Sequence, residues 1–129
     1  MAEGLLRHHL PEGVEVESAG LMALVGNKAE RNARDLMQLR GIDIGGHRAR
    51  QLTDEMCTKA ELILAMDASQ KKEIEEAFPL SRGRVFRLGE KSRMDIFDPY
   101  RMHVEDFSRC LDYIAQGVSD WSERIKKMR

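Results

Sequence analysis

The segment at residues 61–66, ELILAM, constrains the fold of this chain more than any other stretch. It is almost continuously apolar, which is typical of a short strand that is covered on both faces. Two other β-type runs, at residues 14–20 and 84–89, lie on either side of it along the chain, and helical patterns separate the three. Strands that alternate with helices predict an α/β fold with a parallel sheet and right-handed crossovers.

The helical segments carry their own start and stop signals. In residues 27–41, Asn27 is the expected cap and Gly41 the expected end of the helix. A second helix is expected to begin at Ser69 and to stop before Pro79. The last helix has the clearest pattern, because its apolar residues recur at spacings of three and four: Val104, Phe107, Leu111, Ile114, Val118, Trp121 and Ile125.

Length and composition limit the class of protein. A chain of 129 residues can bury one core, and 42% hydrophobic with 33% charged residues is an ordinary globular balance. The net charge of −1 gives no electrostatic case for binding nucleic acid or an anionic membrane. No apolar run approaches the roughly 20 residues of a membrane span. Two cysteines fit a reducing compartment, so we expect a cytoplasmic protein. The length predicts a single domain over residues 1–129.

Five motifs occur in a fixed order along the chain: MAEGLLR from Met1, VESAGLMALVG from Val16, GIDIGGHRARQLT from Gly41, ELILAMD from Glu61 and DPYR from Asp98. Together they resemble the low-molecular-weight protein tyrosine phosphatases, most closely the bacterial type associated with exopolysaccharide production. The resemblance covers essentially the whole chain. It implies a phosphotyrosine phosphatase I-like fold, in which helices flank a parallel sheet, and the hydrolysis of phosphotyrosine.

One part of the family pattern does not occur in these residues. Family members have a first strand that leads into a phosphate-binding loop, Cys-x5-Arg-Ser, followed by Pro-x-Ala-Glu, whereas this sequence opens at Met-Ala-Glu. Ile63 stands six positions after Cys57 and Gln116 six positions after Cys110, so no Cys-x5-Arg is present. We therefore expect an N-terminally truncated domain with three strands and no activity by itself. A misplaced start, a deliberately shortened form and a true loss of the loop all remain open.

The resemblance assigns catalytic and substrate-binding roles to particular residues. In the family, the loop cysteine forms a cysteinyl-phosphate intermediate. Asp98 stands at the position of the acid that protonates the leaving phenolate oxygen and then acts as base toward water. Tyr100 would flank the slot for the substrate ring, and Leu24 would belong to the wall of the site. From the residues alone, Asp98 would be a turn former or an acid at a helix N-terminus.

Three further positions match family residues that surround the phosphate loop. Ser18 and His47 would hydrogen-bond and brace the loop, and Asp67 would lie near it. The plainer readings are a strand-end hydroxyl, an ordinary loop histidine and a helix cap. The family implies no metal or organic cofactor, and the adjacent His8 and His9 diverge by about 100° on a helix, so they cannot share a metal.

Two other functions compete with that of a phosphatase. Thioredoxin-coupled arsenate reductases share the fold but need resolving cysteines after the central strand, where AMDASQKKEIEE has none. The second alternative is a non-catalytic binding module that keeps the fold. Such a module would not need Asp98, so the presence of Asp98 argues against it. For a phosphatase, the resemblance suggests a phosphotyrosine protein as partner, such as an autophosphorylated bacterial tyrosine kinase of the polysaccharide export machinery. The absent strand would lie inside the sheet, so we expect two unpaired edges that favour dimerisation, rearrangement or marginal folding.

Overall fold

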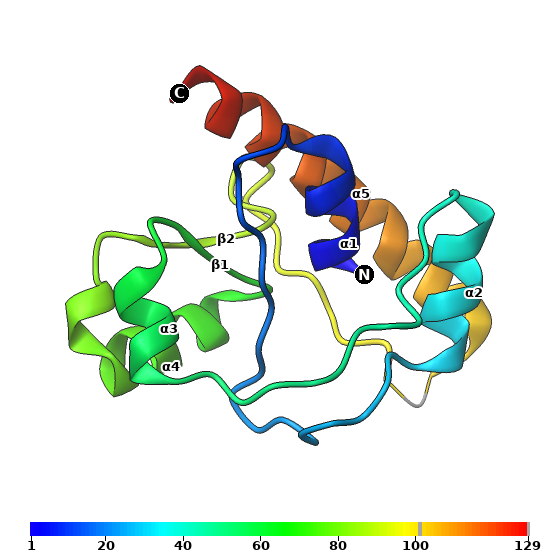
Figure 1. Cartoon of the computed structure of the whole chain (residues 1–129), viewed down its shortest axis with the longest axis horizontal. Coiled ribbons are helices and arrows are strands. Elements are labelled where there is room, and N and C mark those ends of the chain that lie inside the picture. Colours follow the sequence, from blue (N-terminus) through cyan, green and yellow to red (C-terminus); the bar gives the residue numbers. More distant parts are fainter. Residues whose placement is uncertain (101, 129) are drawn as a thin grey trace.

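The structure is a computed structural model of the 129-residue chain, and it describes residues 1–100 and 102–128. Along the chain the elements are α1 (Ala2–His9), α2 (Arg31–Leu39), α3 (Asp54–Lys59), β1 (Ile63–Ala65), α4 (Ala68–Ala77), the short 3-10 helix η1 (Pro79–Ser81), β2 (Val85–Arg87) and α5 (Val104–Lys127) (Figure 1). Helices alternate with strands in the second half of the chain, so the predicted α/β class is confirmed. No helix within the described ranges is both long and apolar enough to cross a bilayer.

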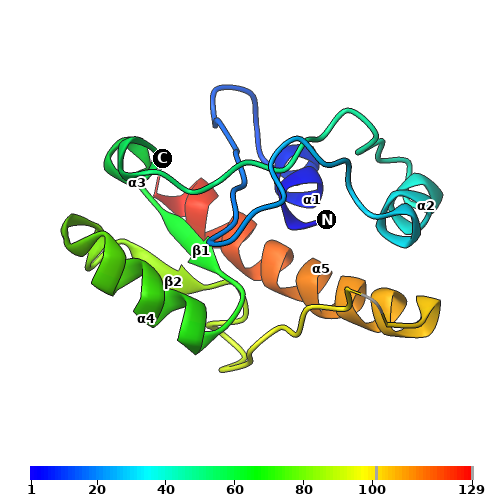
Figure 2. The ribbon, with the colours of Figure 1, turned by 90° about the horizontal axis from the view of Figure 1, so that it is seen from below.

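The two strands pair in parallel, with Ile63 opposite Val85. Ile63, Ala65 and Val85 belong to a small apolar cluster with the buried residues Cys57 of α3 and Ile74 of α4. The alternate positions, including Leu64 and Phe86, pack against the larger core on the other face. Figure 2 shows α4 along one side of the strands and α5 along the other. The apolar run at residues 61–66 is therefore covered on both faces, as its composition predicts.

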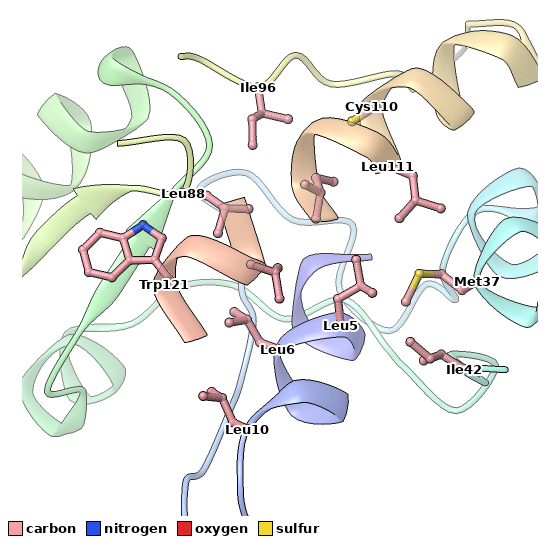
Figure 3. Close-up of a cluster of buried hydrophobic side chains, with 12 residues drawn as sticks. Leu5, Leu6, Leu10, Met37, Ile42, Leu88, Ile96, Cys110, Leu111 and Trp121 are labelled. Carbon is pink, nitrogen blue, oxygen red and sulfur yellow. The ribbon is translucent and has the colours of Figure 1, made fainter. Parts of the chain in front are cut away.

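The larger core joins α1, α2 and α5 (Figure 3). It contains the buried residues Leu5, Leu6, Leu10, Met37, Ile42, Leu88, Ile96, Cys110, Leu111, Ile114, Val118 and Trp121. The predicted stripe of the last helix supplies much of this set, because residues three and four apart share one helix face. The stripe is apolar throughout but not buried throughout, since Val104 at its start is 47% exposed.

The third predicted strand, at residues 14–20, is absent from the sheet, and that prediction is wrong. The segment has the side-chain pattern of a strand, because Val14, Val16 and Ser18 are half-buried while the residues between them are exposed. Its backbone pairing is limited to one parallel bridge between Gly20 and Gln51. A strand needs a neighbour that satisfies its N–H and C=O groups along its length, and the described residues form no such ladder here. The structure therefore has two paired strands where three were expected.

Two predicted helix caps are also wrong, each by two or three residues along the chain. The N-cap of α2 is Glu30, whose carboxylate accepts the Asn32 N–H at 2.7 Å. Asn27 lies before the helix in a loop pairing, where its carbonyl accepts the Ala49 N–H at 2.8 Å. At α4, Asp67 replaces Ser69 as the cap. The helix ends were predicted better: Gly41 follows α2 with φ of +77°, and α4 ends before Pro79.

Candidate active site

The Glu3 carboxylate, in the first turn of α1, is the point on which several polar side chains converge. It accepts a hydrogen bond from the Ser18 hydroxyl at 3.0 Å, and it lies 3.3 Å from Nδ1 of His47. Guanidinium nitrogens of Arg50 and Arg7 lie 3.5 Å and 3.8 Å from the same carboxylate. The Glu3 side chain is only 12% exposed. One carboxylate therefore holds α1 against two separate loop segments.

Glu3 was assigned no role from the sequence, although Ser18 and His47 were. The structure brings Ser18 and His47 to one place, and it does so through Glu3. The signal that could have identified this residue is the opening Met-Ala-Glu, which matches the last three residues of the family's Pro-x-Ala-Glu. A mostly covered carboxylate that serves one hydroxyl, one histidine and two guanidinium groups is a strong constraint, because its removal leaves those groups without this partner.

A small hollow of about 210 Å³ adjoins this cluster. His47 and Arg50 supply its basic side, Ser18 supplies a hydroxyl, and the remaining lining residues are Ala19, Gly20, Ala23 and Ala49. Small residues leave the backbone accessible to a ligand, and a basic side favours a negatively charged group. The hollow therefore has the chemistry of a site for an anion at the edge of the Glu3 cluster.

The segment at residues 21–25 forms an exposed apolar wall beside the hollow. Met22, Leu24 and Val25 are 95%, 61% and 69% exposed, which is unusual for neighbouring large apolar residues. The Gln51 side chain fixes this wall, because its Oε1 accepts the Ala23 N–H at 2.9 Å and its Nε2 donates to the Leu21 carbonyl at 2.6 Å. Gln51 was also missed from the sequence, since a glutamine in a loop carries no signal of a distant partner.

Asp98 lies on the stiff loop that precedes α5. Its Oδ1 accepts the Tyr100 N–H at 3.0 Å, which makes an Asx turn around the buried Pro99. The loop is anchored at its base, because the Cys110 thiol donates to the Phe97 carbonyl at 3.2 Å. Asp98 is exposed and the Tyr100 side chain is 52% exposed, so both are accessible from solvent. The Asp98 carboxylate and the Tyr100 ring are thus exposed two residues apart on one loop.

The surroundings of Cys110 show where this loop lies relative to α1. The pKa of the Cys110 thiol is raised to about 11, because burial and, to a smaller extent, the negative charge of Asp98 raise it, while the ammonium group of Met1 lowers it. The Cys110 thiol bonds to the carbonyl of Phe97, the residue before Asp98, and Met1 and Ala2 pack against the core that contains Cys110. The Asp98 loop and the start of α1, where Glu3 lies, therefore border the same core.

Neither cysteine has the environment of a nucleophile. Cys57 is 2% exposed, and burial followed by the charge of Asp54 raises the pKa of its thiol. Cys110 is 1% exposed and is also shifted upward. Catalytic thiols need the opposite shift, because the thiolate is the reactive form.

Asp67 makes no hydrogen bond or ion pair with the described residues of the Glu3 cluster. Its Oδ1 accepts the Gln70 N–H at 2.7 Å, which is the geometry of an N-cap for α4. The contacts of Asp67 in the structure are therefore those of a helix cap. No group of three or more His, Cys, Asp or Glu side chains suited to a metal ion occurs among the described residues.

Comparisons with known proteins agree with the motif order. The profile of the family described as low molecular weight phosphotyrosine protein phosphatase matches residues 1–129. A probable low molecular weight protein-tyrosine-phosphatase, EpsP of Ralstonia nicotianae, is 48% identical over 99% of this chain and 88% of its own length. Vibrio vulnificus Wzb in complex with benzylphosphonate has a TM-score of 0.91 and 29% identity, covering 95% of this chain and 87% of its own. The YwlE arginine phosphatase from Geobacillus stearothermophilus has a TM-score of 0.92 and 30% identity, covering 98% and 84%.

Proposed function

This chain belongs to the low molecular weight phosphotyrosine protein phosphatase family, and from that membership we propose that its residues form the acid loop and the supporting shell of a tyrosine phosphatase. The observation that carries the proposal is the placement of Asp98. An exposed carboxylate is held by an Asx turn beside an exposed aromatic ring. Its loop is tied to Cys110 in the core against which the start of α1 packs, and Glu3, Ser18 and His47 meet at that start.

In the proposed reaction Asp98 acts on the oxygen that leaves the phosphate. It donates a proton to the phenolate oxygen as the phosphorus–oxygen bond breaks, and it then takes a proton from the water that hydrolyses the phosphoenzyme. The Asx turn fixes the backbone on both sides of Asp98 and leaves Oδ2 for this exchange. Tyr100 flanks the substrate ring, where an aromatic face stacks on the phenyl group.

We propose that Glu3 and its partners brace a phosphate-binding loop of the family type at the start of α1. Ser18 and His47 face that end of the helix through the Glu3 carboxylate, and Arg50 adds positive charge beside it. Groups locked by packing and by hydrogen bonds hold a reacting group in place more precisely than groups on a free loop. In this proposal the brace positions the loop and does not contact the reacting atoms.

The nucleophile is the part of the reaction that these 129 residues do not provide. They contain no Cys-x5-Arg, and both of their cysteines are buried with raised pKa values. The amides and the arginine of such a loop would supply most of the charge stabilisation in the transition state. We therefore propose that the chain by itself does not turn over a phosphate ester.

The substrate class we propose is a phosphotyrosine protein in the cytoplasm. Relatives named as protein-tyrosine-phosphatases support phosphotyrosine, and buried free cysteines fit a reducing compartment. The likeness to an arginine phosphatase makes phosphoarginine the second candidate. Tyr100 and the exposed apolar residues Met22 and Leu24 favour an aromatic substrate group over a charged guanidine. A bacterial tyrosine kinase of polysaccharide export is the partner that we propose to test first.

The test of Asp98 uses a version of the protein in which a family-type strand and Cys-x5-Arg-Ser-Pro segment is joined before Met1. We expect Asp98→Asn to lower kcat/KM, which covers the steps up to departure of the phenol, by ~10²–10⁴-fold for an aryl phosphate with a poorly acidic phenol, because that leaving group needs the proton most. The loss should shrink with a highly acidic phenol, which leaves without help. Asp95→Asn is the matched control, because Asp95 lies on the same loop but pairs with Arg87. An Asp98→Asn loss independent of the leaving group, or no greater than that of Asp95→Asn, would contradict the assignment.

A further inference from the structure

A larger cleft of about 640 Å³ lies between α1 and the segment at residues 41–50. His47 and Arg50 line both this cleft and the smaller hollow of the candidate active site, so these two side chains form the partition between them. The volume falls within the range of roughly 300–1,000 Å³ that is typical of small-molecule sites. The cleft is therefore a separate candidate site that the proposed phosphatase chemistry does not use.

The floor of the cleft depends on a close approach between α1 and the segment that follows α2. A Cβ atom at Gly4 would lie 2.8 Å from Cγ2 of Ile44, so only glycine allows the helix to come this near. Ile42 and Ile44 give the floor an apolar surface. Gly41 and Gly46 at the margin leave open space, since a Cβ on either would meet no atom within 4 Å.

The rim of the cleft carries more positive than negative charge. Arg7, Arg48 and Arg50 line it, and the acids that line it are Glu3 and Asp43. Glu3 is already shared by Arg7, Arg50 and His47. Asp43 accepts the Gly45 N–H at 2.8 Å through Oδ1. Two carboxylates, one of them shared three ways, do not balance three guanidinium groups.

Arg48 is the guanidinium with the weakest compensation. It donates to the carbonyl oxygens of Gly45 and His47 at 3.0 Å and 2.9 Å, and it makes no ion pair with any described residue. Neutral carbonyls hold the Arg48 side chain over the segment without neutralising its charge. Arg7 is similarly held by the Val16 carbonyl, and its side chain is 61% exposed. Arg48 thus keeps its charge for a ligand, and Arg7, which lies 3.8 Å from the shared Glu3 carboxylate, keeps a largely exposed guanidinium.

We propose that this cleft binds a small phosphorylated molecule, with Arg48 and Arg7 as ligands of the phosphate. Guanidinium groups bind phosphate oxygens through paired, charge-assisted hydrogen bonds, which is the chemistry that a rim with more guanidinium than carboxylate groups offers. The uncharged part of the ligand lies on Ile42 and Ile44. Arg7 is also a partner of Glu3, so a phosphate bound by Arg7 competes with Glu3 for this guanidinium and alters the brace of the candidate active site.

The experiment titrates the chain as it exists with inorganic pyrophosphate and follows backbone amide shifts by NMR, with calorimetry for the affinity. We expect saturable binding with the largest shifts at Gly41, Gly46 and Arg48. Arg48→Ala and Arg7→Gln should each weaken binding about tenfold or more, which corresponds to the loss of a charge-assisted contact. Arg82→Ala, at an exposed arginine beyond η1, should leave the affinity unchanged.

Three results would overturn the proposal. The first is an absence of saturable binding at millimolar pyrophosphate. The second is an equal loss of affinity in all three variants, which would show binding to net charge alone. The third is a set of shifts confined to Ser18, Gly20 and Ala23, which would place the anion in the smaller hollow. That third result would leave the proposed phosphatase function intact, so the two proposals fail separately. If Arg48→Ala does not fold, Arg7→Gln at the surface decides the question.

Discussion

At the scale of single residues, Glu3 does most to determine where the site lies. Its carboxylate connects α1 with Ser18 on one loop and with His47 and Arg50 on another. These partners are 15 or more positions away along the chain, so their meeting is a consequence of the tertiary fold. The order of motifs in the sequence identifies Ser18 and His47 as candidates, but only the structure shows what joins them.

We expect Glu3→Gln to lower the free energy of unfolding by about 1–3 kcal/mol, because the amide can keep one hydrogen bond but leaves the neighbouring cations without a negative partner. Urea denaturation of the chain measures this change. Glu12→Gln is the matched control, since Glu12 is exposed in the turn after α1. Equal stability of the two variants would show that Glu3 is not the link between α1 and the loops.

The two thiols give a second prediction at this scale. Burial raises the pKa of both Cys57 and Cys110, the latter to about 11. At about pH 8 both remain protonated and covered, so the native chain should react with a thiol reagent far more slowly than the denatured chain. Spectrophotometric titration with a disulfide reagent checks this. One fast-reacting thiol in the native chain would reopen the question of a nucleophile within these 129 residues.

At the scale of elements, the apolar pattern predicts helices and strands that depend on residues close in the sequence. It does not predict strand pairing, which depends on residues far away in the sequence. The stripe of α5 and the apolar run of β1 follow from periodicity and burial, and both were predicted. The helix α3 was missed because its six residues are too few to show a period. The segment at residues 14–20 alternates like a strand, but pairing requires a neighbour that the pattern cannot supply.

The contact of α5 with the loop after β2 depends on Gly117. A Cβ atom at this position would lie 2.8 Å from the carbonyl oxygen of Leu88, and Leu88 is only 1% exposed. Alanine favours a helix over glycine by about 1 kcal/mol, but a clash with buried backbone costs more than that when the core cannot shift. We therefore expect Gly117→Ala to destabilise the chain by about 1–3 kcal/mol in thermal or urea unfolding. Ser119→Ala, on the exposed face two residues later, should change stability little, and a stabilising Gly117→Ala would show that the contact is loose.

At the scale of the whole molecule, the sheet has an edge that the described residues do not cover. The backbone bonds of Ile63 and Ala65 go to β2, so in a parallel ladder Leu64 directs its N–H and C=O to the opposite side. The extended segment at residues 14–20 is likewise paired only at Gly20. Such unpaired backbone is a template for pairing with another chain.

We therefore expect the chain to self-associate reversibly as its concentration rises through the micromolar to millimolar range. Light scattering coupled to gel filtration measures the mass, and amide hydrogen exchange at Leu64 and Val16 should slow in the associated state. A compact monomer at every concentration would contradict this prediction, because the unpaired backbone would then not cause association.

The most direct test of the account is the hydrolysis of a simple aryl phosphate by two proteins assayed side by side. One is the chain of 129 residues, and the other carries the family-type strand and Cys-x5-Arg-Ser-Pro segment before Met1. We predict turnover by the extended protein and none by the chain alone, because we propose that these residues supply the acid and the brace and that the added segment supplies the nucleophile and the phosphate cradle. Turnover by the chain alone would contradict it, since the nucleophile would then be among the residues described here as buried or structural.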